Sequence, residues 1–143
     1  MMRKTENSRF ELGLAKLAEV DGKAGEEIVA PLGDLGKYII EFAFGDIYQR
    51  EGLSLREREI ATVAMLTVLG RETQLRVHIH AALNVGLSAE EIEETIIQTV
   101  PYAGFPTAIN GIHILKEVVS EARITPHRPA ASPPQNRHGP RRT

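Results

Sequence analysis

A carboxylate and an imidazole occur in two neighbouring helical segments, where acid–base chemistry is one of two readings. Glu59 lies between Leu55 and Val63 at helical spacing, so it falls within an apolar stripe. A buried carboxylate either holds a proton or pairs with a cation. The competing reading is a solvated glutamate paired with Arg56 or Arg58. The first reading makes Glu59 a candidate catalytic residue.

The second segment carries a polar row of Arg71, Gln74 and His78. Their spacing of i, i+3 and i+7 puts them on one face of a helix. His78 borders the apolar side, where it is either catalytic or a core-edge histidine bonded to a backbone carbonyl. His80 lies on the opposite side of the same helix. Because alternate residues of a helix do not share a face, the two histidines do not form a zinc site, and no metal is expected.

Tyr102 is a further candidate for lining a ligand site. It lies beside Gly104 in a segment bounded by Pro101 and Pro106, which suits either the close approach of a ligand or a simple bend. The sequence has no cysteine, which excludes disulfides, thiolate metal sites and a cysteine nucleophile. It also lacks a Walker loop, a dinucleotide-binding glycine pattern and a recognisable Ser/His/Asp order.

Helical periodicity and stop signals predict the elements that carry these residues. Gly70 separates two helices that form a central hairpin over residues 55–86. Two Ser-x-x-Glu capping boxes mark the helix starts after positions 54 and 88. Further helices are predicted over residues 7–20, 34–49, 88–100 and 106–122, with a short one over 26–30 and a linker beginning at Pro101. The sequence therefore predicts an all-α, compact domain of about six helices.

Composition indicates one helical domain over residues 1–124 and a Pro- and Arg-rich tail over residues 125–143. The tail has five prolines, four arginines and no acidic residue, and we expect it to be a disordered, solvated extension rather than a contact for RNA or an acidic partner. The remainder holds 13 basic and 19 acidic residues, a net charge of −6, which argues against nucleic-acid binding by the folded part.

Hydropathy gives a further expectation about location. No apolar run reaches the length of a membrane span, and the first residues lack the apolar core of a signal peptide. We therefore expect a cytoplasmic protein with no membrane partner.

Three sequence blocks resemble the carboxymuconolactone decarboxylase family: FGDIY, LGRETQLRVHIHAALNVGLSAEEI and YAGFP. The resemblance extends over roughly residues 9–122. It implies an all-helical, alkylhydroperoxidase D-like fold that assembles into homo-oligomers, as trimers or hexamers. In the peroxidase branch of the family, a Cys-x-x-Cys pair works beside a glutamate and a histidine. The matching positions here are Arg71 and Gln74, with Glu59 and His78, so the thiol chemistry of that branch is absent.

The decarboxylase branch implies a cofactor-free lyase that acts on γ-carboxymuconolactone, or a related carboxylated lactone, in aromatic-compound catabolism. On this resemblance His78 is the general acid, Glu59 orients or charges it, and Arg71 binds the substrate carboxylate or lactone oxygen. Substrate-binding positions are Gln74, His80 and Tyr102, the last two either from the same subunit or from a neighbour. The glutamate at position 59, where the branch commonly has a small polar residue, favours a different lactone or acid as substrate.

Two other functions remain open from the sequence. The first is a non-enzymatic, oligomeric small-molecule-binding protein of the same fold, which predicts that Glu59, Arg71 and His78 point into separate environments. The second is a peroxidase-like activity that uses an external thiol in place of its own.

Overall fold

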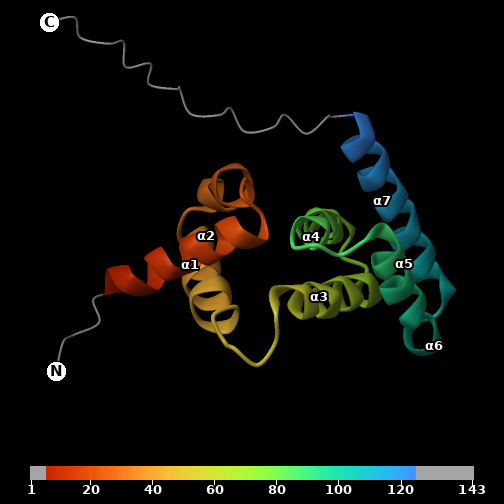
Figure 1. Ribbon diagram of the computed structural model, residues 1–143, viewed down its shortest axis with the longest axis horizontal. Coiled ribbons are helices and arrows are strands. Elements are labelled where there is room, and N and C mark those ends of the chain that lie inside the picture. Colours follow the sequence, from red (N-terminus) through yellow and green to blue (C-terminus); the bar gives the residue numbers. More distant parts are fainter. Residues whose placement is uncertain (1–5, 125–143) are drawn as a thin grey trace, which may run out of the picture.

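The computed structural model describes residues 6–124, and within this range every regular element is helical, which confirms the all-α prediction. In Figure 1 the α3–α4 hairpin lies between the N-terminal elements on one side and α5–α7 on the other. The predicted tail, residues 125–143, lies outside the described residues. The elements are α1 (Glu6–Val20), η1 (Gly25–Val29), η2 (Ala30–Leu32), α2 (Asp34–Tyr38), η3 (Ile39–Ile47), α3 (Leu55–Leu69), α4 (Glu72–Asn84), α5 (Ala89–Gln98), α6 (Val100–Ala103) and α7 (Phe105–Ile124).

The structure differs from the sequence prediction at two places. The segment predicted as one helix over 34–49 begins as an α-helix and continues from Ile39 as the wider π-helix η3, which ends at Tyr48 with a bond from its amide to the carbonyl of Ala43. The predicted linker after Pro101 is wrong, because the short helix α6 runs through this proline. Proline suits a first helical turn, where its missing N–H has no partner to lose.

Two clusters of buried side chains form the core. One joins α3, α4, α5 and α7, and the other joins α1, η1, η3 and Ala81 of α4. Helix α4 therefore contributes to both clusters and forms the wall between them. Their fully buried members include Val63, Leu75, Ile79, Ile92, Ile96 and Val118 in the first, and Val20 in the second. No helix within residues 6–124 is both long and apolar enough to cross a membrane.

Helix α1 approaches η3 closely at Gly13. A Cβ atom added at Gly13 would lie 2.8 Å from the carbonyl carbon of Ile40, closer still to its oxygen, and 3.0 Å from the amide nitrogen of Gly45. Such distances leave no room for a methyl group. An ion pair between Arg9 and Asp46 closes the same helix pair at its exposed end.

The hairpin turn and both capping boxes form as the sequence predicts. Gly70 ends α3 in the left-handed conformation, with φ of 67°, and the next amide, of Arg71, returns to the carbonyl of Leu66. Ser54 and Ser88 each accept a bond from the backbone amide three residues later, and the glutamate there bonds back to the serine amide. After the turn α4 packs against α3, which brings His78 beside Glu59.

Replacing Ser88 with alanine is expected to lower the free energy of unfolding by about 1 kcal/mol, because the amide of Glu91 loses its acceptor. Chemical denaturation near neutral pH measures this change. Ser120→Ala, an exposed position inside α7, is the matched control and should leave stability nearly unchanged. Equal denaturation midpoints for the two variants would contradict a stabilising cap.

The capping carboxylates also predict acid sensitivity. Bonds from the backbone amides of Ser54 and Ser88 hold the pKa values of Glu57 and Glu91 below the usual range. The two carboxylates therefore stabilise the fold above the ordinary glutamate pKa of about 4.3. This stabilisation is lost as the pH falls through their lower folded pKa values. When the pH is lowered from about 5 to about 3, we expect the denaturant concentration at the midpoint of unfolding to fall. It should fall less in a Glu57→Gln/Glu91→Gln variant. An equal drop in both proteins would rule out this origin.

Candidate functional site

The structure brings Glu59 and His78 together in the interior of the hairpin. Glu59 of α3 is completely buried, with 0% of its surface exposed. Its Oε2 lies 2.9 Å from Nδ1 of His78 on α4, and its Oε1 accepts a bond of 2.8 Å from the hydroxyl of Tyr48. Both carboxylate oxygens thus have a hydrogen-bond partner, which resolves the main cost of burying this group.

Neither neighbouring arginine pairs with Glu59, so the solvated reading of this residue is wrong. Arg56 bonds to the carbonyl of Gly86 and to Glu91. Arg58 donates to the carbonyl of Arg50 over 2.7 Å instead. Glu59 is turned inward, where the carboxylate meets an imidazole and a phenol.

The hydrogen bonds fix how His78 can act. An ionised carboxylate only accepts, so Nδ1 of His78 carries the proton in this bond. The second ring nitrogen, Nε2, is then available to another group, either as acceptor or, on the protonated ring, as donor. The side chain of His78 is 25% exposed, so the pair is reachable from outside although Glu59 is not. A buried carboxylate behind a partly exposed imidazole is an arrangement suited to general acid–base catalysis.

Tyr48 is the residue of this site that the sequence reading missed. Tyr48 follows η3, and its ring lies against that of Phe44 with centroids 4.8 Å apart. Its hydroxyl, however, points to Glu59 and lies 3.4 Å from Oγ1 of Thr62. A tyrosine placed only a short loop before a buried carboxylate was the available signal, because a buried phenol needs a polar partner.

Burial and the charge of Glu59 raise the pKa of the Tyr48 hydroxyl well above its usual range. The phenol therefore keeps its proton and acts as a permanent donor to the carboxylate. Arg58 lies over the other side of the ring, with its guanidinium carbon 5.8 Å from the ring centroid.

Arg71 and Gln74 lie on the His78 face of α4 but do not contact the Glu59–His78 pair. Both side chains are exposed, and Arg71 precedes the first turn of the helix. Seven residues separate Arg71 from His78, a rise of roughly 10 Å along the helix. The guanidinium of Arg71 makes no hydrogen bond or ion pair within residues 6–124.

His80 and Tyr102 lie away from the pair. His80 is on the far side of α4, 3.7 Å from a carboxylate oxygen of Glu121, beside the ion pair of Arg76 with the same helix α7. Tyr102 of α6 is 82% exposed. It borders an apolar surface that includes Met65 and Leu69 at the end of α3. Within one chain, neither residue reaches the imidazole of His78.

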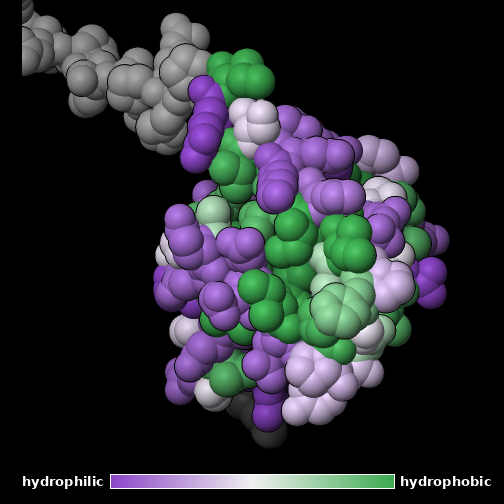
Figure 2. Space-filling model, turned by 90° about the vertical axis from the view of Figure 1, so that its right-hand side faces the viewer, coloured by the Kyte–Doolittle hydropathy of each residue, from purple (hydrophilic) through white to green (hydrophobic). Residues whose placement is uncertain are grey.

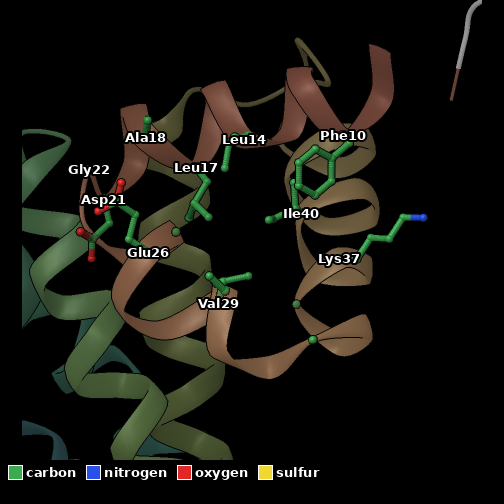
Figure 3. Close-up of a pocket in the computed structure, with 14 residues that line it drawn as sticks. Phe10, Leu14, Leu17, Ala18, Asp21, Gly22, Glu26, Val29, Lys37 and Ile40 are labelled. Carbon is green, nitrogen blue, oxygen red and sulfur yellow. The ribbon is translucent and has the colours of Figure 1, made fainter. Parts of the chain in front are cut away.

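A separate groove of about 590 Å³ lies between α1, η1 and α2 (Figure 3). Its walls are mostly apolar, with Phe10, Leu14, Leu17 and Val29 among them, and it includes Lys37 and two acidic residues at its edges. None of the predicted site residues lines it. Its chemistry is that of a hydrophobic surface, so the hydrogen-bonded pair, and not the size of a hollow, identifies the candidate site. The described residues also contain no group of three or more histidine, aspartate and glutamate side chains that could hold a metal ion.

Large apolar side chains remain exposed on the α5–α7 side of the molecule. Figure 2 faces this side and shows hydrophobic patches between hydrophilic side chains. Exposed apolar residues of these helices are Ile97, Tyr102, Phe105, Ile109 and Ile124. A second exposed set lies along α2 and η3, at Leu35, Tyr38 and Phe42. Within the single chain this set is uncovered.

Comparison with known proteins gives concordant matches. The sequence model of the carboxymuconolactone decarboxylase family matches residues 33–117. A 4-carboxymuconolactone decarboxylase of Acinetobacter baylyi is 33% identical over 128 residues, which is 86% of this chain and 96% of the relative. A nitrosuccinic acid decarboxylase of Metarhizium robertsii is 26% identical over 83 residues, 58% of each chain. An uncharacterised 15.0 kDa protein of Paracoccus denitrificans is 33% identical over 108 residues, 73% of this chain and 78% of that protein.

Proposed function

Because the chain belongs to the carboxymuconolactone decarboxylase family, we propose that it is a cofactor-free decarboxylase of a carboxylated lactone of the γ-carboxymuconolactone kind. The observation that carries this proposal is the hydrogen bond between the buried carboxylate of Glu59 and Nδ1 of a partly exposed His78. This bond leaves Nε2 of the imidazole as the acid of the site.

The reaction needs no electron sink from outside the substrate. When the bond to the carboxylate carbon breaks, carbon dioxide leaves and the electron pair passes into the unsaturated lactone carbonyl, giving a dienolate. His78 then delivers the proton on Nε2 to carbon, which yields the neutral lactone and leaves the imidazole neutral. The hydrogen bond to Glu59 keeps the ring in one orientation during this step.

Arg71 supplies the positive charge where anionic oxygen develops. Its side chain is exposed, and it directly precedes the helix that carries His78. A planar guanidinium can hold a carboxylate or an enolate oxygen with two parallel bonds. Gln74, between Arg71 and His78 in the sequence, adds a neutral donor. His80 and Tyr102 enter the proposal only as residues that a neighbouring copy contributes to the pocket.

The chemical class of the substrate is an acid whose carboxylate leaves toward an electron-withdrawing group. Relatives named for a carboxylated lactone and for a nitro acid both fit this description. A buried glutamate, in place of a small polar residue, fixes the imidazole through a hydrogen bond. This favours a substrate whose decarboxylation needs a proton donor held in one position. We therefore propose a related lactone or acid as well as γ-carboxymuconolactone itself.

The test is turnover by the purified full chain. γ-Carboxymuconolactone and nitrosuccinate are each incubated with the protein, and substrate loss and carbon dioxide release are followed. Release of one carbon dioxide per substrate consumed, faster than in buffer, is expected for at least one of them. Rates equal to buffer with both acids would contradict the proposal, and saturable binding without turnover would favour a non-enzymatic binding protein.

The exposed apolar faces support self-association as part of the same proposal. Contiguous apolar surface on a soluble protein commonly marks an interface. We propose that copies of this chain associate as trimers or hexamers through the α5–α7 face and the uncovered stripe of η3, and that the assembly closes the open side of the His78 site. Light scattering coupled to size-exclusion chromatography determines the number of copies.

A further inference from the structure

We propose that Tyr48 is a positioning residue for the Glu59–His78 pair, whose hydroxyl holds one carboxylate oxygen so that the other stays directed at the imidazole. This inference rests on the proposed function of His78 as the proton donor. Tyr48 belongs to neither helix of the hairpin and reaches Glu59 from the end of η3, across the loop that leads into α3.

Each carboxylate oxygen of Glu59 has its own hydrogen-bond partner. Tyr48 bonds Oε1 over 2.8 Å and His78 bonds Oε2 over 2.9 Å, so two partners on opposite oxygens fix the plane of the group. Glu59 is completely buried, so bulk water has no direct access to replace a lost partner. Removing the phenol would leave Oε1 unsatisfied and concentrate the negative charge on the bond to His78.

Tyr48 is itself held in place by several neighbouring side chains. Its ring contacts Phe44, and the guanidinium of Arg58 lies over it. Arg58 is anchored in turn by its bond to the carbonyl of Arg50. Oγ1 of Thr62 lies 3.4 Å from the hydroxyl and donates to the carbonyl of Arg58. A side chain so constrained can fix the direction of its hydroxyl bond, which a mobile surface tyrosine cannot do.

Tyr48 acts on His78 only through Glu59. Within residues 6–124, Glu59 is the charged group at ion-pair distance from the imidazole. The guanidinium of Arg58 lies over the tyrosine ring and donates to the carbonyl of Arg50. The other charged or titratable side chains of α4 are Glu72, Arg76 and His80. Arg76 and His80 face the glutamates of α7, and Glu72 lies with Arg76 in a hollow beside α7. A change at position 48 therefore reaches His78 by a single route.

The expected consequence is a change in rate and pH dependence without a change in substrate binding. In Tyr48→Phe the concentrated charge of Glu59 holds the proton on His78 more strongly, which makes the imidazolium a weaker acid. We expect kcat to fall about tenfold, which corresponds to about 1.4 kcal/mol. KM should stay within about twofold of the wild-type value, because Tyr48 does not touch the substrate. The alkaline limb of the kcat–pH profile should move to higher pH by about half a unit to one unit.

Ser120→Ala is the control. It removes a hydroxyl from an exposed position inside α7 that belongs to neither exposed apolar set, and it should behave as wild type. Glu59→Gln provides a second control. If Tyr48 works through the carboxylate, adding Tyr48→Phe to Glu59→Gln should change kcat by less than about twofold. Equal effects of Tyr48→Phe in both backgrounds would overturn the proposal.

A readout independent of turnover separates this inference from the proposed function. Nitrogen NMR of the full chain reports the tautomer and the titration of His78, whose signal is identified by its loss in His78→Asn. Tyr48→Phe should raise the titration midpoint of this signal, and Ser120→Ala should not. A raised midpoint in a protein that turns over no acid would refute the decarboxylase and retain the positioning role. An unchanged midpoint in a Tyr48→Phe protein with wild-type unfolding free energy would refute the positioning role.

Discussion

Replacing His78 with alanine is expected to lower kcat of the decarboxylation by roughly 10²- to 10⁴-fold, the range that a positioned general acid contributes. The imidazole is bonded to the buried carboxylate and is partly exposed. Without it, solvent must protonate the dienolate, and Glu59 loses one of its two hydrogen-bond partners. Steady-state kinetics at saturating substrate measure the effect, with substrate loss followed optically.

His113→Ala is the matched control for this variant. His113 is an exposed histidine of α7 and makes no contact with the Glu59–His78 pair, so its removal should leave kcat unchanged. Because a buried glutamate without its partner is costly, the folded fraction of His78→Ala must be measured by circular dichroism, and His78→Asn serves as a better-tolerated second variant. A folded His78 variant with wild-type kcat would refute the role of His78 as the acid.

Replacing Gly13 with alanine is expected to lower the free energy of unfolding by about 3 kcal/mol or more, at the upper end of the cost of overpacking. The new methyl group would overlap the backbone of Ile40, which cannot move aside as a flexible side chain can. An alanine inside a helix would otherwise stabilise it by about 0.5–1 kcal/mol, so the sign of the change is itself informative. Urea or guanidinium denaturation measures the change.

Gly52→Ala tests whether the effect comes from the close approach of α1 and η3. A Cβ atom at Gly52 meets nothing within 4 Å, and its φ is not in the left-handed region. This variant should be as stable as wild type or slightly more stable. A Gly13→Ala protein as stable as Gly52→Ala would show that the two helices do not pack as closely as described.

The sequence could predict the hairpin and its caps because the signals are local. Gly70 and the two Ser-x-x-Glu boxes act within one helical turn, and each forms as predicted. The apolar spacing around Glu59 also placed this carboxylate inside, where the structure has it. The meeting of Glu59 with His78 was left open by the sequence, since it depends on the relative rotation of two helices and not on the pattern within either one.

Tyr48 could not be assigned from helical periodicity, because η3 is not wound as an α-helix. In a π-helix each residue turns through a smaller angle, so faces counted at α-helical spacing drift from the true ones along the segment. Pro101 was misread for a different reason, since the same residue that ends a helix interior is favoured in a first turn. Both differences arise where one residue type or spacing is compatible with two backbone conformations.

Helix α4 has buried residues in both core clusters, and this has a consequence for how the protein unfolds. Because both clusters share α4, we expect them to unfold together. The N-terminal layer of α1, η1 and η3 cannot detach without exposing Ala81 and one side of α4 to water. Because the same layer carries Tyr48, local opening there would also release the carboxylate of Glu59. The Glu59–His78 pair is therefore intact only in molecules in which both halves are folded. We expect activity to be lost on heating together with the cooperative unfolding of the whole domain, and not with fraying at either end.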